Sequence, residues 1–204
     1  MRIAGAARPL ALGLGLLAVL LLPAGAAWAQ LLDDPGAAKA ITCSACHGDA
    51  GNSRSNSMPI IAGLDPAYFK KQIEAYASGK RPSPEMEPFA KQAQFLGVDD
   101  LAAYFARQIM APTPIRVDGA AVDRGRQLSG ACVACHVNAG QADPARLIPR
   151  LAGQPPGYLY QQMVLFKDDR RNPGDAAIQA VKAAIKPLSD AQLRDLAAYF
   201  ASVQ

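Results

Sequence analysis

The sequence predicts an all-α protein made of two similar halves, and three observations lead to that prediction. The pattern Cys-x-x-Cys-His occurs at Cys43–His47 and again at Cys132–His136, an offset of 89 residues. Apolar residues recur at helical spacing along most of the chain, and no alternating strand pattern of useful length interrupts them. Other segments repeat at nearly the same offset. A repeat of this length indicates two similar domains rather than a stack of short repeats.

The N-terminal segment has the features of an export signal. Arg2 and Arg8 supply a positive region, residues 10–22 are apolar, and Ala27-Trp28-Ala29 is a typical cleavage site. We therefore expect residues 1–29 to be a signal peptide. An uncleaved membrane anchor is the alternative, but the apolar run is shorter than the roughly 20 residues that a span needs. No later segment is long and apolar enough to span a membrane.

The first half should contain three helices. Gly36–Thr42 is expected to be a short helix that leads into the first motif. Asp65–Ser78 has apolar residues at helical spacing and Pro66 at its start. Val98–Met110 should close the half. The apolar positions of the middle helix are Tyr68, Phe69, Ile73 and Tyr76.

The second half is expected to repeat this order. Val122–Ser129 leads into the second motif, and Pro156–Lys167 repeats the helix that begins with a tyrosine. Ser189–Val203 closes the half, and its Ser-x-x-Gln start predicts a capping box between Ser189 and Gln192.

A linker separates the halves where proline interrupts the helical pattern. Pro112 and Pro114 prevent the chain from continuing as a helix. We therefore place domain 1 at residues 30–110, the linker at 111–121 and domain 2 at 122–204.

Cys-x-x-Cys-His is the attachment signature of a covalently bound c-type haem. Residues i, i+3 and i+4 share one face of a helical turn, so two thiols there reach the two vinyl groups of one haem. The adjacent imidazole then reaches the iron. Zinc is disfavoured because four ligands must surround one ion, and disulfides or redox cysteine pairs would not explain a histidine after each motif. The sequence predicts two haem c groups, bound through Cys43, Cys46 and His47 and through Cys132, Cys135 and His136.

The net charge is uninformative about partners. Without the signal segment the chain would begin at Gln30, and removal of Arg2 and Arg8 reduces the 21 basic residues to 19, against 17 acidic ones. Haem propionates would cancel this excess. No strong basic patch or stripe occurs, so nucleic-acid binding is not indicated.

The repeated segments extend well beyond the two motifs. Residues 59–63 match 149–153 in a Pro-x-x-Ala-Gly pattern, and residues 101–105 match 196–200 in a Leu-Ala-Ala-Tyr-Phe pattern. With a methionine loop, these features resemble the dihaem cytochrome c4 family, and they are similar to the cytochrome subunit of flavocytochrome sulfide dehydrogenase. The resemblance implies an all-α fold of two tandem class I cytochrome c domains, each wrapped around one covalent haem.

The resemblance also implies roles for residues near the haems. The carbonyls of Pro59 and Pro149 should accept a hydrogen bond from His47 and His136, although both prolines could simply shape a turn. Arg81 and Arg171 are expected either to contact haem propionates or to be exposed to solvent.

Met86 is expected to be the distal ligand of the first haem iron. A methionine thioether favours Fe(II) and raises the reduction potential. Met58, which directly precedes Pro59, is expected to be a packing residue, and Met110 at a helix end is expected to be structural.

The second distal ligand is left open by the sequence. Residues 172–181 contain neither methionine nor histidine, although the family pattern places a methionine at about 177–180. Met163 is a weak candidate, because it aligns with Ile73 inside a helix. Lys182 or Lys186 could ligate, but a lysine is more often solvated. A five-coordinate haem, water or a ligand from another chain are the other options, and we expect an open or weakly ligated iron. Gln179, the nearby neutral hydrogen-bond donor, is expected at the surface.

These expectations favour a periplasmic dihaem electron carrier that is not an enzyme. It would pass single electrons between a dehydrogenase or quinol-oxidising complex and a terminal oxidase, so that membrane complexes are possible partners. Two alternatives are a haem subunit of a larger dehydrogenase and a ligand-binding haem protein that uses the second iron. A peroxidase-type site is disfavoured because no distal histidine is left to act as an acid or base.

Overall fold

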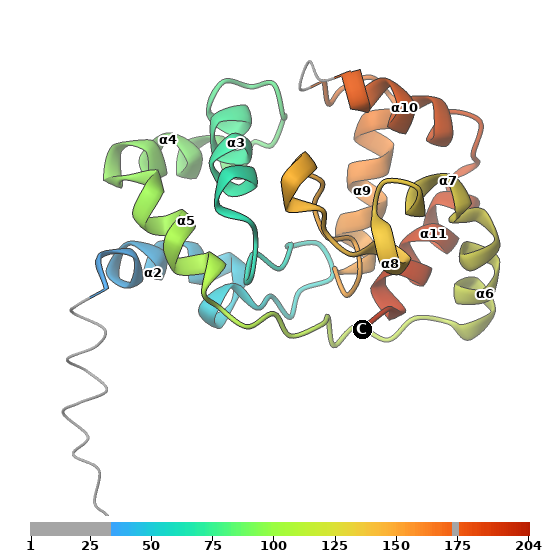
Figure 1. Cartoon of the computed structure of the whole chain (residues 1–204), viewed down its shortest axis with the longest axis horizontal. Coiled ribbons are helices and arrows are strands. Elements are labelled where there is room, and N and C mark those ends of the chain that lie inside the picture. Colours follow the sequence, from blue (N-terminus) through green and yellow to red (C-terminus); the bar gives the residue numbers. More distant parts are fainter. Residues whose placement is uncertain (1–33, 173–175) are drawn as a thin grey trace, which may run out of the picture.

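The computed structural model describes residues 34–172 and 176–204, and the regular elements in these ranges are helices. An isolated β-bridge joins Asp143 and Ile148. Figure 1 shows two helical groups side by side, joined by an extended segment. The expected signal peptide, residues 1–29, lies outside the described residues. Within the described ranges, no helix has the length and apolar character needed to cross a membrane.

The first group contains four α-helices and a short 3-10 helix. Asp34 caps the first of them by accepting a hydrogen bond of 2.9 Å from the Gly36 N–H, and Asp65 caps the next through the Tyr68 N–H at 2.9 Å. Proline follows each cap, where its missing N–H is not needed. The elements are α2 (Pro35–His47), η1 (Asp49–Gly51), α3 (Pro66–Ala77), α4 (Met86–Leu96) and α5 (Val98–Ala106).

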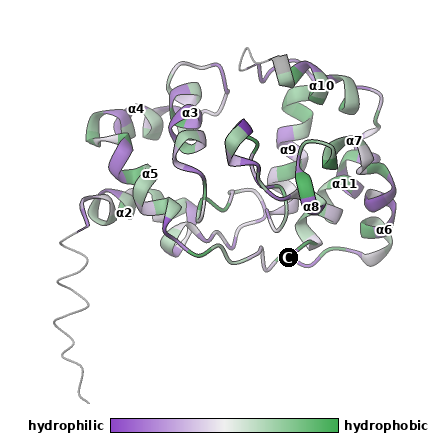
Figure 2. Cartoon of the chain, viewed as in Figure 1, coloured by the Kyte–Doolittle hydropathy of each residue, from purple (hydrophilic) through white to green (hydrophobic). Residues whose placement is uncertain are grey.

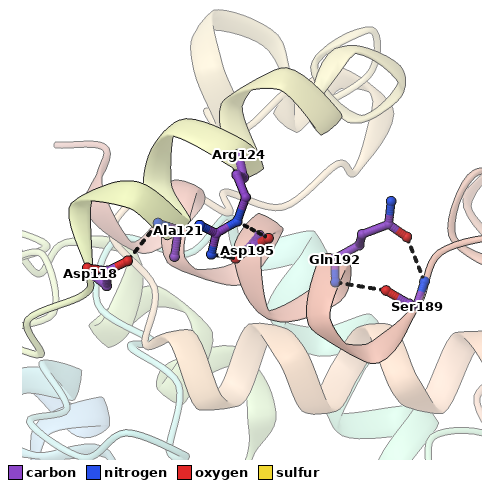
Figure 3. A network of polar contacts seen from close by, with 6 residues as sticks. All are labelled: Asp118, Ala121, Arg124, Ser189, Gln192 and Asp195. Carbon is purple, nitrogen blue, oxygen red and sulfur yellow. Dashed lines mark hydrogen bonds and ion pairs between the residues drawn. The ribbon is translucent and has the colours of Figure 1, made fainter.

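The second group repeats this order with extra short helices. Residues 109–118 lead into it without regular structure. The predicted capping box is confirmed at its last helix, where Ser189 and Gln192 exchange hydrogen bonds (Figure 3). The elements are α6 (Gly119–Leu128), α7 (Gly130–Val133), α8 (Val137–Gly140), η2 (Pro144–Arg146), α9 (Pro156–Lys167), α10 (Ala176–Ile185) and α11 (Asp190–Ser202).

The first and last helices of each group cross at a glycine. A Cβ atom at Gly36 would overlap the carbonyl oxygen of Asp100, and one at Gly125 would overlap that of Asp195. The side chain of each of these aspartates also forms an ion pair with a basic side chain on the first helix of its group. Lys39 pairs with Asp100, and Arg124 donates two hydrogen bonds of 2.8 Å to Asp195 (Figure 3). Each crossing therefore combines close backbone packing with an ion pair.

Each group has its own apolar core. In the first, Phe69 of α3 stacks on Phe105 of α5 with ring centroids 5.6 Å apart. In the second, Leu159 of α9 packs with Leu196 and Phe200 of α11. The haem motifs adjoin these cores, since Cys43 packs against the first and Cys132 against the second.

The expected helices are all present, although the helix expected to reach Met110 ends at Ala106. Two further helices, α4 and α10, precede the last helix of each half. Met86 is the first residue of α4, and the stretch that lacks methionine in the second half contains α10. The expectation of a methionine loop was therefore wrong. Ala90 and Ala93 are buried on one face of α4, and Pro88 is tolerated because it lies in the first turn.

Polar contacts also join the two groups. The Gln154 side chain accepts a hydrogen bond from the Ile60 N–H at 2.9 Å and donates one to the Ile60 carbonyl at 2.8 Å. Asn56 accepts hydrogen bonds from the backbone N–H groups of Gly157 and Tyr158, each at 3.0 Å. In Figure 1, α3 and α9 lie on the inner sides of the two groups.

Candidate haem sites

The first motif ends helix α2, so that the helix itself sets the spacing of its side chains. Cys43 is half-buried and Cys46 is exposed, and both thiols are free. The His47 ring is only 6% exposed, and its Nδ1 lies 2.8 Å from the Pro59 carbonyl oxygen. Since a carbonyl only accepts, Nδ1–H is the donor and Nε2 keeps its lone pair free to bind a metal.

The second motif makes the same histidine–proline contact, but its residues do not lie in one continuous helix. Cys132 lies in α7, whereas His136 directly precedes α8. The His136 Nδ1–H donates to the Pro149 carbonyl at 2.8 Å, which fixes the same tautomer as at His47. Both predicted proline contacts are therefore confirmed.

Burial tunes the titration of these groups. It lowers the pKa of His47 and of His136, so both imidazoles are neutral, as iron ligation requires. Burial also raises the pKa of the Cys43 and Cys132 thiols, which keeps them protonated before any bond to haem forms. Within the described ranges, no cluster of three or more His, Cys, Asp or Glu side chains is arranged to hold a bare metal ion.

Met86 is the expected distal ligand of the first haem. Its side chain is half-buried and packs against the same apolar core as Cys43. The Ser83 hydroxyl accepts a hydrogen bond of 3.2 Å from the Met86 N–H, which fixes the start of α4.

The candidate distal ligands of the second half lie in surroundings that differ from those of Met86. Met163 packs against the core of its own domain, which Cys132 also contacts. Lys182 is only 9% exposed, and its ammonium lies 2.9 Å from Asp169, so it is not the solvated lysine that would be usual. Lys186 is exposed and lies 4.0 Å from the same carboxylate. Gln179 is exposed, as expected.

Arg81 and Arg171 are buried between the two halves, so solvent exposure, one of the two alternatives left open for them, is ruled out. Arg81 donates to Gln72 of its own half at 2.7 Å and to Gln162 of the other at 2.9 Å. Arg171 mirrors this, with Gln162 at 2.7 Å and Gln72 at 3.1 Å. Arg81 also donates to the Tyr158 hydroxyl at 2.9 Å.

This arginine pair suits a nearby anionic group. The side chains that accept these hydrogen bonds are all neutral, and each guanidinium also lies 4.4 Å from the centre of an aromatic ring. The Nε atoms of Arg81 and Arg171 are both buried without a partner. Two buried like charges with unused donors are costly unless anions neutralise them. Haem carries such anions in its propionates, so these residues fit the predicted cofactor.

Sequence reasoning missed most of the polar contacts between the halves. Gln72 and Gln162 repeat at an offset of 90 residues, the same offset as Arg81 and Arg171, so the repeat itself could have indicated them. Gln154 has no such signal, because its counterpart at that offset is Leu64.

Comparisons with known proteins agree with the site. A family model described as cytochrome c matches residues 122–204. Cytochrome c4 of Pseudomonas aeruginosa is 34% identical over 172 residues, which cover 80% of this chain and 85% of that protein. A protein of Stutzerimonas stutzeri named thiosulfate dehydrogenase electron acceptor is 33% identical over 93% of both chains. The crystal structure of reduced cytochrome c4 from Pseudomonas stutzeri matches with a TM-score of 0.75 and 24% identity, over 83% of this chain and 97% of that one.

The repeated helical fold and the paired Cys-x-x-Cys-His sites define a c-type cytochrome with two haem c groups. The chain belongs to the cytochrome c4 family. It is an electron carrier and not an enzyme.

Proposed function

We propose that this protein is a periplasmic relay that takes single electrons from a dehydrogenase and passes them on, with its two haems in separate domains. The domains would span residues 30–110 and 122–204, after removal of residues 1–29. The matching Nδ1–carbonyl hydrogen bonds of His47 and His136 give the strongest support. The proposed ligands are Cys43, Cys46, His47 and Met86 for the first haem, and Cys132, Cys135 and His136 for the second.

The chain holds each imidazole ready for iron. A bound haem supplies the one-electron chemistry. The Pro59 and Pro149 carbonyls orient the rings and increase their basicity by accepting the Nδ1 protons. Because His47 is buried, its Nε2 has little competition from water.

The arginines between the halves would bind haem propionates. Arg81 and Arg171 lie on opposite sides of the domain boundary, yet each donates to glutamines on both sides. Propionates on the free Nε donors would neutralise both charges and bring an edge of each haem toward the same interface. Electrons could then pass between the haems within one chain.

A thiosulfate-oxidising dehydrogenase is the partner that the comparisons suggest. The relative from Stutzerimonas stutzeri is named as the electron acceptor of such an enzyme, and the match covers 93% of both chains. We propose the same class of electron donor for this protein. A membrane-bound terminal oxidase is the proposed acceptor.

Stopped-flow mixing tests this proposal. The oxidised holoprotein should be reduced when mixed with a purified thiosulfate dehydrogenase and thiosulfate, and the change should amount to two electrons per chain. The same mixture without thiosulfate is the control. Enzyme turnover with an artificial acceptor but without reduction of this protein would contradict the proposed partner. Fractionation of the native cells tests the periplasmic location.

A haem subunit of a larger dehydrogenase is the second candidate. Four large apolar side chains of the described residues are exposed, and all four precede the second half. A permanent partner would cover such side chains. Copurification of a second subunit from native cells at a constant ratio would favour this alternative. The four residues are Ile41, Phe89, Phe95 and Ile109.

A further inference from the structure

Helices α4 and α10 present the same pattern of buried positions. In α4, Met86 is half-buried, and Ala90 and Ala93 follow it as buried residues at i+4 and i+7. Residues at this spacing lie on one face of a helix. This face carries the proposed distal ligand of the first haem.

The corresponding face of α10 begins at Ile178. Ile178 is half-buried, and Lys182 and Ile185 follow as buried residues at the same i+4 and i+7 spacing. The next helix then begins five residues after the last buried position in both halves, at Val98 and at Asp190. The register of burial therefore matches Ile178 with Met86, and Ile178 lies within the range of about 177–180 where the family pattern places a methionine.

Ile178 has no atom that can bind iron, and its neighbours on α10 supply little more. Val181 and Ala184, which are also half-buried in this helix, are likewise aliphatic. Figure 2 shows α10 mostly in the hydrophobic colours. The face that holds a thioether in the first half is thus predominantly hydrocarbon in the second.

The other candidate ligands of the second half differ from Met86 in their contacts and in their place on the helix. Lys182 lies on the same face, but its ammonium is 2.9 Å from the Asp169 carboxylate. Met163 occupies the position of Ile73 in the repeat and packs into the core of its domain, as the buried Ile73 does in the first. Neither Lys182 nor Met163 lies at the start of its helix, whereas Met86 does.

We propose that the second haem of this protein has an open distal position that binds a small neutral diatomic ligand, and that Ile178 stands where a methionine would close it. A neutral ligand suits this site, because aliphatic side chains supply no charge or hydrogen bond to an anion. Carbon monoxide and nitric oxide belong to this class. The inference rests on the proposed role of Met86 in the first haem.

Titration of the dithionite-reduced holoprotein with carbon monoxide tests the proposal. The wild-type protein should bind one carbon monoxide per two haems. Ile178→Met should abolish this binding and double the weak ferric absorption band that reports methionine–iron bonding. Ile178→Leu, which changes the shape but adds no sulfur, should still bind one.

The assignment of Met86 is tested separately. Met86→Ala should bind two carbon monoxide molecules per chain and lose the methionine–iron band. If Met86→Ala retains that band while wild type binds one carbon monoxide, the proposed first ligand is wrong but the second site is still open.

Three results would overturn the inference. Wild-type protein that binds no carbon monoxide has a closed second haem, and Met163→Leu and Lys182→Ala then identify the residue that closes it. A stoichiometry of one that persists unchanged in a folded Ile178→Met variant would disprove the register match. If Met86→Ala loses the methionine–iron band but still binds only one carbon monoxide per chain, the ligand binds at the first haem and the open site has been placed in the wrong half.

Discussion

Single residues decide what each iron site can do, and the two histidines show how little the sequence needs to specify. In His47 and in His136, the Nδ1–H donates a hydrogen bond of 2.8 Å to a proline carbonyl. Each ring therefore has the tautomer whose Nε2 is available for ligation. Burial lowers the pKa of both rings and keeps them neutral. Both halves therefore share the proximal hydrogen bond, and the candidate distal residues are where the two sites differ most.

Replacement of Met86 by histidine should separate the two haems electrochemically. An imidazole in place of the thioether favours Fe(III), so the first reduction potential should fall, within the roughly 0.8 V range that axial ligands span. A spectroelectrochemical titration measures both potentials, and the second should stay unchanged. Met58→Leu, which changes the packing methionine next to Pro59, is the control. An unchanged first potential in Met86→His would mean that Met86 is not the ligand.

At the scale of helices, the fold depends on two crossings that lack side chains at their centres. Gly36 and Gly125 allow the first helix of each half to approach the backbone of the last. The ion pairs at Asp100 and Asp195 then fix the angle between the helices. Because α6 is followed directly by α7, which carries Cys132, this crossing also helps to position the start of the second motif.

Gly125→Ala should destabilise the second half. The added Cβ would overlap the Asp195 carbonyl, and strain of this kind in a packed interface costs about 1–3 kcal/mol. Chemical denaturation monitored by circular dichroism measures the loss. Gly119→Ala is a matched control in the same helix, because no atom lies within 4 Å of a Cβ there, and its stability should stay within about 1 kcal/mol of wild type. Equal stabilities of the two variants would contradict the packing argument.

The ion pair at the same crossing should make stability depend on acid. The hydrogen bond from Arg124 lowers the pKa of the Asp195 carboxyl below its unfolded value. A carboxyl with a lowered folded pKa stabilises the fold above the unfolded pKa of about 4, and this contribution is lost as the pH falls through the folded value. Asp195→Asn should therefore be modestly less stable than wild type at pH 7, and the difference should shrink below pH ~4.

Thermal unfolding of holoprotein at a series of pH values measures that difference. Asp123→Asn is the control, since Asp123 is 67% exposed and lies 3.5 Å from Arg126 on the same helix. A constant difference between Asp195→Asn and wild type from pH 7 to pH 3 would show that the carboxylate charge contributes nothing.

At the scale of the whole molecule, the sequence predicts features that are local or repeated. It misses contacts between residues that are far apart in the chain. The motifs and the helices that flank them follow from spacing and from the repeat, whereas both proline contacts follow from the resemblance to the cytochrome c4 family. The burial of Arg81 and Arg171 could not be read from either arginine alone, because it requires Gln72 and Gln162, ninety residues apart, to meet between the halves. Lys182 was misjudged for a similar reason, since its partner Asp169 and the position of α10 depend on tertiary packing.

The contact of Gln154 with Ile60 indicates how firmly the two halves are docked. One buried side chain satisfies both the N–H and the carbonyl of a residue in the other half. Gln154→Ala would leave both groups unsatisfied, at a cost of about 1–3 kcal/mol each if water does not replace the amide. Because covalent linkage keeps the halves together, the expected result is looser docking rather than global unfolding.

Limited proteolysis measures this loosening, because residues 109–118 connect the halves without regular structure. The chain of Gln154→Ala should be cut in this segment several times faster than wild type, while each half stays resistant. Gln127→Ala, at an exposed position of α6, is the matched control and should be cut at the wild-type rate. Equal rates for both variants would mean that the other contacts between the halves, those of Asn56 and of Arg81 and Arg171, hold them together without Gln154. The docking would then depend in part on the two arginines, and hence on the haem propionates that we propose they bind.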